Sequence, residues 1–198
     1  RRVLFRSDSF ESSSGIGVSG AVGGRKLALG NTALMEQLRV TVDSLKPQAE
    51  ALRAEGASAM FLAVDGQPAG LLAVSDPVKA TTMEALTALK ASGMRVIMAT
   101  GDGLTTARAV AARLGIDEVH GEVKPADKLA LVDKLQREGR IVAMAGDGIN
   151  DAPALAKADV GVAMGTGTDV AMNSAQVTLV KGDLRGIAQA RVISEQTI

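Results

Sequence analysis

The chain changes its pattern of apolar and polar positions near Ser75. Before that point, short apolar runs alternate with polar residues, and Gly23-Gly24 stands between two of them, which predicts a β-hairpin. Residues 43–55 instead repeat apolar positions with a helical period and are followed by a glycine, which is typical of a helix end. A second pair of apolar runs flanks Asp65-Gly66 and predicts another hairpin. We expect a domain boundary near Ser75, where this pattern stops.

Beyond Ser75, helical segments alternate with short apolar runs. Helices are expected over 78–93, 104–115, 125–139, 152–158 and 184–198. Strands are expected over 94–100, 117–123, 140–145 and 159–164. This alternation predicts an α/β fold with a parallel sheet that is covered on both faces. Ligands of such sheets bind at the loops that leave the carboxyl ends of the strands, which here are TGDG (100–103), GDGIND (146–151) and GTGT (165–168).

Composition excludes several classes of function. The sequence has no Cys and one His, which argues against thiolate and His-built metal sites. The formal net charge is zero and there is no basic block, so nucleic acid is not an expected partner. No apolar run approaches the roughly 18 residues that a membrane span needs. Residues 1–7, RRVLFRS, read as the translation of a sequencing-adapter end and are expected to be foreign; the alternative is an ordinary basic tail.

The stretch GDGIND places two carboxylates, Asp147 and Asp151, in one glycine-rich loop after a buried strand. Two acids so close together repel each other unless a cation lies beside them. Mg²⁺ is the natural candidate, because it takes oxygen ligands and usually bridges to a phosphate. The alternative is a plain turn with an aspartate that caps the next helix.

Two further segments carry groups suited to phosphate. In ATGDG, the Thr100 hydroxyl and the backbone N–H groups of Gly101 and Asp102 are able to hold phosphate oxygens; the alternative is a polar turn. Lys128 lies in the first turn of the helix expected from Pro125, where a cation opposes the helix dipole by roughly 0.3–1 kcal/mol. A bound anion offsets that cost, and the alternative is a solvated surface lysine.

The segment GIGVSG matches a G-x-G-x-x-G spacing at Gly15, Gly17 and Gly20. A dinucleotide-binding fingerprint needs a helix after the glycines, and here the continuation reads as strand, so we reject that interpretation. Two alternatives stay open: a twisted hairpin, and a close approach of the backbone to a flat ligand, which glycine permits because it has no Cβ.

A hydroxyl and a lysine for phosphate, with two acids for Mg²⁺, are the parts used in phosphoryl transfer. A nucleophilic acid is missing from this set. Such an acid follows an apolar strand, typically as D-K-T-G-T or D-x-D-x-T, and no aspartate of the sequence stands in that setting.

With these residues in hand, the chain resembles P-type ATPases of the heavy-metal-transporting branch. The motifs DPVK, TGD, KPADK, MAGDGINDAPALAKADVGVAMGTGTDVA and VTLVKGDL appear in the order of that family, and the match runs from about Phe10 to the end. The TDVA and VTLVKGDL stretches most resemble those of copper(I) or silver exporters.

The resemblance implies an architecture and a set of roles. Residues 8–75 are similar to part of a nucleotide-binding domain, residues 76–184 to part of a phosphorylation domain with a haloacid-dehalogenase-like Rossmannoid fold, and residues 185–198 to a helix leading to a membrane domain. By this resemblance the roles fall on four groups of residues: Asp147 and Asp151 at Mg²⁺, Thr100, Gly101, Asp102 and Lys128 at the phosphoryl group, Asn150 in the catalytic pocket, and Gly15, Gly17, Gly30 and Asn31 at the nucleotide.

Three functions are compatible with these residues. The first is a cytoplasmic segment of a membrane-embedded copper(I) transporter that uses ATP and Mg²⁺ through an aspartyl-phosphate. This segment by itself is expected to be inactive, because it lacks the nucleophile. The alternatives are a truncated soluble phosphatase of the haloacid-dehalogenase-like group and a non-catalytic nucleotide-binding module.

Overall fold

In the computed structural model, residues 8–13, 15–75, 77–165, 169–179 and 181–197 are described. The proposed foreign segment 1–7 and most of the predicted loop GTGT lie outside the described residues. Contacts between Cα atoms divide the chain into two compact units. The first contains Arg1–Asp76 and Asp102–Val110, and the second contains Pro77–Gly101 and Ala111–Ile198.

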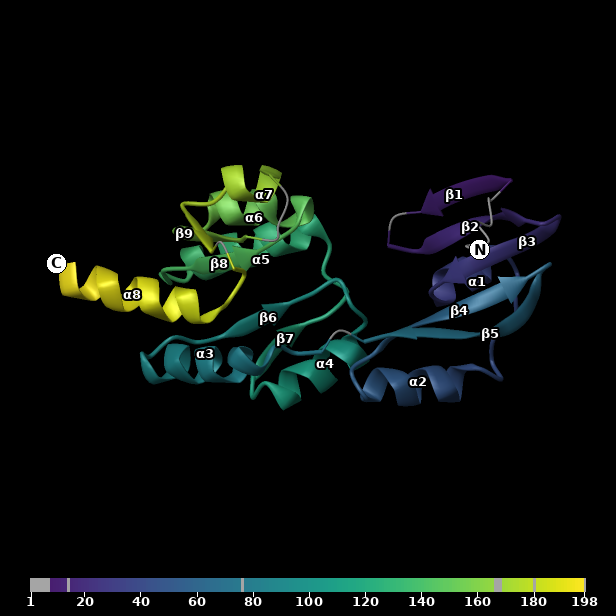
Figure 1. The fold of residues 1–198 in the computed structure, drawn as a ribbon, viewed down its shortest axis with the longest axis horizontal. Coiled ribbons are helices and arrows are strands. Elements are labelled where there is room, and N and C mark those ends of the chain that lie inside the picture. Colours follow the sequence, from purple (N-terminus) through teal and green to yellow (C-terminus); the bar gives the residue numbers. More distant parts are fainter. Residues whose placement is uncertain (1–7, 14, 76, 166–168, 180, 198) are drawn as a thin grey trace, which may run out of the picture. The chain divides into compact units, whose positions relative to one another are not determined.

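The first unit is built on an antiparallel five-stranded sheet in which each strand pairs with the next along the chain (Figure 1). Its strands are β1 (Ser9–Ser13), β2 (Gly17–Val22), β3 (Arg25–Gly30), β4 (Ser58–Val64) and β5 (Gln67–Val74). Both predicted hairpins are confirmed. Asp65 and Gly66 have φ angles of 50° and 76°, the left-handed values that a two-residue hairpin turn requires.

Two helices, α1 (Thr32–Gln37) and α2 (Lys46–Ala54), pack on one face of this sheet. Phe61 of β4 and Met35 of α1 are fully buried between the layers. Helix α2 begins three residues later than predicted, because Pro47 stands in its first turn, where proline is favoured. The preceding Asp43 pairs with Lys46 at 2.6 Å instead of joining the helix.

The second unit alternates helices and strands. Its helices are α3 (Ala80–Ala91), α5 (Pro125–Arg137), α6 (Ala152–Lys157), α7 (Asp169–Asn173) and α8 (Arg185–Thr197), while α4 (Leu104–Arg113) spans the division between the units. Its strands are β6 (Ile97–Ala99), β7 (Glu118–His120), β8 (Ala143–Gly146), β9 (Val160–Met164) and β10 (Val177–Leu179). Every strand pair in this unit is parallel, as predicted.

The predicted α/β fold with parallel strands is confirmed, and in the described residues of the second unit these strands are divided between two sheets. One has the order β10-β9-β8 and the other contains β6 and β7. Helices α5, α6 and α7 lie around β8 and β9 (Figure 1), and the centre of β9 is buried. β8 and β6 each have one edge without a described strand, and Ile141, just before β8, is 89% exposed. No helix in the described ranges combines the length and the apolar character that crossing a membrane requires.

Candidate functional site

The GDGIND loop is held together by the Asp151 carboxylate. Strand β8 ends at Gly146, and a 3₁₀ turn, Ile149–Asp151, leads directly into α6. The side chain of Asp151 is buried, and its Oδ2 accepts hydrogen bonds from the backbone N–H groups of Asp147 at 3.2 Å and Gly148 at 3.1 Å. Asp151 therefore fixes the shape of the loop on which it stands.

Gly146 is required for this arrangement because Asp151 packs directly against it. A Cβ added at Gly146 would lie 2.7 Å from the Asp151 Cβ and 2.8 Å from its Oδ2. Gly146 is not among the glycines with positive φ, so backbone conformation does not explain a glycine at this position. The structure shows a steric requirement instead, which no sequence signal reveals without knowledge of the loop.

Lys128 meets the second oxygen of the same carboxylate. Its Nζ donates to Asp151 Oδ1 at 2.7 Å, and the two side chains are only 16% and 8% exposed. Lys128 lies in the first turn of α5, where its charge opposes the helix dipole. The anion expected to offset that cost is, in this structure, the Asp151 carboxylate. Asp127 helps at the same helix end by accepting a hydrogen bond from the Lys124 N–H at 2.9 Å.

Thr100 is tied through its backbone to the segment that leads into α5. Its N–H donates to the His120 carbonyl at 3.0 Å, and its carbonyl accepts from the Val123 N–H at 2.9 Å. The half-buried Thr100 thus sits at the end of β6 beside the chain that carries Lys128. Gly101 keeps open space around its Cα, since the nearest atom to an added Cβ is the Val123 carbonyl oxygen at 3.8 Å.

Asp102 is separated from these residues in the division of the chain. It belongs to the first unit, where its Oδ1 accepts a hydrogen bond from the Ser58 hydroxyl at 2.8 Å. In the same segment the buried Thr106 donates to the Ala57 carbonyl at 2.9 Å. The predicted phosphate-binding role of Asp102 stays a prediction.

Asp147 presents its carboxylate to solvent, as does Asn150 its amide. Among the described residues, none forms an ion pair or hydrogen bond with the Asp147 side chain, and none of their acidic or His side chains gather in a group of three able to hold a metal. Asp147 therefore suits a cation such as Mg²⁺ that keeps several waters. Both oxygens of Asp151 already accept hydrogen bonds, so Asp151 suits the support of that loop better than direct ligation.

The four residues predicted at the nucleotide lie together in the first unit. Gly17 and Gly30 are register partners in β2 and β3, and a Cβ on Gly17 would come within 2.4 Å of the Leu29 carbonyl oxygen. Asn31 caps α1 by accepting from the Leu34 N–H at 3.2 Å, and it donates to the Gly15 carbonyl at 2.9 Å. Close strand packing explains Gly17 and Gly30. Gly15 has nothing within 4 Å of an added Cβ and is the member with space for a ligand.

Comparison with curated proteins finds P-type ATPases over nearly the whole chain. A copper-transporting P-type ATPase of Rhizobium leguminosarum bv. viciae is 56% identical over 189 residues, which are 96% of this chain and 22% of that protein. A silver exporting P-type ATPase of Salmonella typhimurium is 53% identical over 189 residues, again 96% of this chain and 23% of the relative. The chain thus spans about a quarter of the length of these relatives, and its resemblance to copper and silver P-type ATPases is confirmed.

Solved structures give the same result for the fold. A zinc-transporting PIB-type ATPase in the E2.Pi state matches with a TM-score of 0.67 and 30% identity over 98% of this chain and 31% of that one. The catalytic domain of the CPx-ATPase CopB-B matches with a TM-score of 0.66 and 27% identity over 94% of this chain and 66% of that one. The family model for haloacid dehalogenase-like hydrolases matches residues 3–159. By sequence and by fold, the chain belongs to the haloacid dehalogenase-like hydrolase family.

Proposed function

We propose that this chain is a cytoplasmic segment of a membrane-embedded exporter that uses ATP to move copper(I) through an aspartyl-phosphate intermediate. The observation that carries the proposal is the pair of contacts made by the Asp151 carboxylate. Its Oδ1 accepts a hydrogen bond from the Lys128 Nζ at 2.7 Å, and its Oδ2 accepts hydrogen bonds from two backbone N–H groups of the GDGIND loop. This arrangement places an ammonium group beside an exposed carboxylate-bearing loop, as phosphoryl transfer requires. The copper and silver relatives support the choice of transported ion.

The nucleophile is proposed to come from a strand outside this chain. In the described residues β6 pairs only with β7, and the outer edge of β8 is open. An unpaired edge offers a row of backbone N–H and C=O groups that a further strand is able to satisfy. A parallel strand at the open edge of β8 would end where β8 ends, so an aspartate after it would lie on the same side of that sheet as the loop carrying Asp147.

Mg²⁺ fits the oxygen chemistry of this loop. Asp147 would hold it as a direct ligand, and Asp151 would keep the loop in shape while neutralising Lys128. When bound, the ion would shield the negative charge of the phosphoryl oxygens. Lys128 would orient the same phosphoryl group through an N–H that Asp151 does not use, and the Thr100 hydroxyl would do so by hydrogen bonding.

A chimera tests this function directly. Residues 8–198 replace the matching segment of the Rhizobium leguminosarum ATPase, which is 56% identical over 189 residues. We expect the chimera to form an acid-stable phosphoenzyme from ATP in the presence of Mg²⁺ and copper(I). Asp147→Asn in the chimera should reduce phosphoenzyme by at least about 100-fold, because the loop loses its ionised ligand.

Asp117→Asn is the matched control, since Asp117 is fully exposed and lies 4.0 Å from Lys90. It should leave phosphoenzyme formation unchanged. A folded, membrane-inserted chimera without phosphoenzyme would overturn the proposal, and normal phosphorylation of the Asp147→Asn variant would overturn the metal role. Hydrolysis of p-nitrophenyl phosphate by the 198-residue chain alone would favour the soluble phosphatase instead.

A further inference from the structure

The start of α8 is capped by Asp183. The Arg185 N–H donates to Asp183 Oδ1 at 3.0 Å, and the Gly186 N–H donates to the Asp183 carbonyl at 3.0 Å. The guanidinium of Arg185 turns back onto the same carboxylate, with Nη2 at 2.7 Å and Nε at 3.1 Å from Oδ2. A carboxylate at this position satisfies free N–H groups of the first turn and suits the helix dipole.

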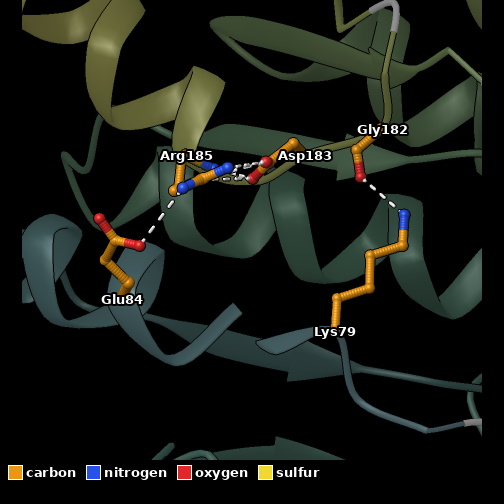
Figure 2. A network of polar contacts seen from close by, with 5 residues as sticks. All are labelled: Lys79, Glu84, Gly182, Asp183 and Arg185. Atoms are coloured by element: carbon orange, nitrogen blue, oxygen red, sulfur yellow. Dashed lines mark hydrogen bonds and ion pairs between the residues drawn. The ribbon is translucent and has the colours of Figure 1, made fainter. Parts of the chain in front are cut away.

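The first turns of α3 reach this cap from the other side, as Figure 2 shows. Glu84 of α3 pairs with Arg185 Nη1 at 3.4 Å, and Lys79, the residue before α3, donates from Nζ to the Gly182 carbonyl at 3.1 Å. Residues from two positions near the start of α3 therefore contact the turn that begins α8.

Apolar packing contributes little to the attachment of α8. Over its described residues, α8 has no fully buried side chain; Ile187 and Ala188 are half-buried, and Val192 and Ile193 are 50% and 64% exposed. One tight contact lies at its start, where a Cβ on Gly186 would come within 2.7 Å of the Leu179 Cδ2. Since burial of apolar area is the usual source of helix docking, the direction of α8 depends on the polar contacts at its first turn.

We propose that Lys79, Glu84, Asp183 and Arg185 form a polar clamp that makes α8 move as one body with the first turns of α3. The clamp is neutral, with two cations and two carboxylates, and each side chain in it has a partner across the α3–α8 contact or within it. Lys79 and Glu84 lie shortly after Pro77, where the chain passes into the second unit. A displacement of the chain at that point is thereby transmitted to α8.

The clamp rests on contacts within the second unit, and only its use to transmit motion in a longer transporter depends on the proposed function. Its test therefore uses the chain alone, without ATP or copper. If this test contradicts the clamp, the proposed function is unaffected. If the chimera forms no phosphoenzyme, the clamp is unaffected.

Spin labels on introduced cysteines measure the distance between α3 and α8. The sequence has no Cys that would have to be removed first. Ala88→Cys in α3 and Ser194→Cys in α8 place labels at exposed positions of the two helices. We expect a narrow distribution of label-to-label distances in the otherwise unchanged chain. Arg185→Gln should widen this distribution by about twofold, and should speed amide exchange in the first turn of α8 by about tenfold.

The control is Arg191→Gln, which removes the same type of ion pair from α8, here with Glu195 at 2.8 Å and within one helix. It should leave the distance distribution unchanged. Glu84→Gln is a milder variant that keeps the Asp183 cap and removes only the bridge to α3, so it should widen the distances without speeding exchange in α8. Equal distributions in Arg185→Gln, Glu84→Gln and Arg191→Gln would overturn the clamp.

The clamp should also weaken in acid. The hydrogen bonds from Arg185 lower the pKa of Asp183 to about 2, below the ordinary value of 3.8. A group whose pKa is lower in the folded state stabilises that state above its unfolded pKa and loses this effect as the pH falls through the folded pKa. Protonation would leave Arg185 with Glu84, and Lys79 with the Gly182 carbonyl.

The expected result is a melting temperature that differs between the unchanged chain and Asp183→Asn above about pH 4, with the difference shrinking as the pH falls and vanishing only below about pH 2. Circular dichroism at 222 nm measures both melting curves. A difference that stays constant across this pH range would contradict the role of the Asp183 charge.

Discussion

Lys128→Met should destabilise the second unit by about 3 kcal/mol, the largest expected effect of any change in the candidate site. The Lys128 and Asp151 side chains are 16% and 8% exposed, and the distance between Nζ and Oδ1 is 2.7 Å. Removing the ammonium leaves a buried carboxylate without its cation, which costs far more than losing a surface ion pair. Methionine keeps most of the side-chain volume, so the loss reports the charge rather than a cavity.

Urea unfolding followed by circular dichroism measures this change, since the sequence has no Trp or Tyr to serve as a fluorescent probe. Lys157→Met is the matched control. Lys157 pairs with Asp133 at 3.3 Å, but the two side chains are 44% and 30% exposed, so its replacement should cost below about 1 kcal/mol. Equal costs for the two lysines would show that the Lys128–Asp151 pair is no stronger than a surface contact.

Gly17→Ala should cost the first unit about 3 kcal/mol. Its added Cβ would lie 2.4 Å from the Leu29 carbonyl oxygen and 2.6 Å from the Gly30 Cα, both of them backbone atoms. Strands β2 and β3 would have to separate at this point. The loss would occur without any nucleotide present, because it arises from strand packing.

Gly15→Ala is the comparison that separates packing from ligand binding. Gly15 has a φ of 73° but nothing within 4 Å of an added Cβ, so the change should cost about 1 kcal/mol from backbone strain alone. Thermal unfolding of both variants measures the contrast. Similar losses in the two variants would contradict the interpretation of Gly17 as a packing glycine.

Much of the fold follows from local signals. The glycines after α3, α5 and the 43–55 segment end their helices with φ values of 80°, 77° and 86°, as their positions after helical patterns predict. The division into two sheets does not follow from such signals. Which strands pair depends on contacts between residues that are distant in sequence. The apolar pattern of one strand does not reveal which other strand lies beside it. The short helices α1 and α7 were missed because five or six residues carry too little periodicity, and the strand β10, with three residues, carries even less.

The site could be predicted as a set of residues but not as a set of contacts. Strand ends and loop glycines indicated where Thr100, Lys128, Asp147 and Asp151 would stand. They did not indicate that Asp151 would turn inward to Lys128 while Asp147 faces solvent, because the two aspartates look equivalent in the sequence. Burial separates their roles, and burial of a polar side chain depends on the partners that the whole unit supplies.

One carboxylate sets both the backbone course of the GDGIND loop and the location of the Lys128 ammonium, while Gly146 leaves it only enough room for its present size. The residues at these three positions therefore cannot change independently without loss of this contact. A longer acidic side chain at residue 151 would no longer match the length of the Lys128 side chain. Any side chain at residue 146 would clash with the side chain at residue 151. Engineering of this loop must therefore replace the glycine, the aspartate and the lysine together, or keep all three.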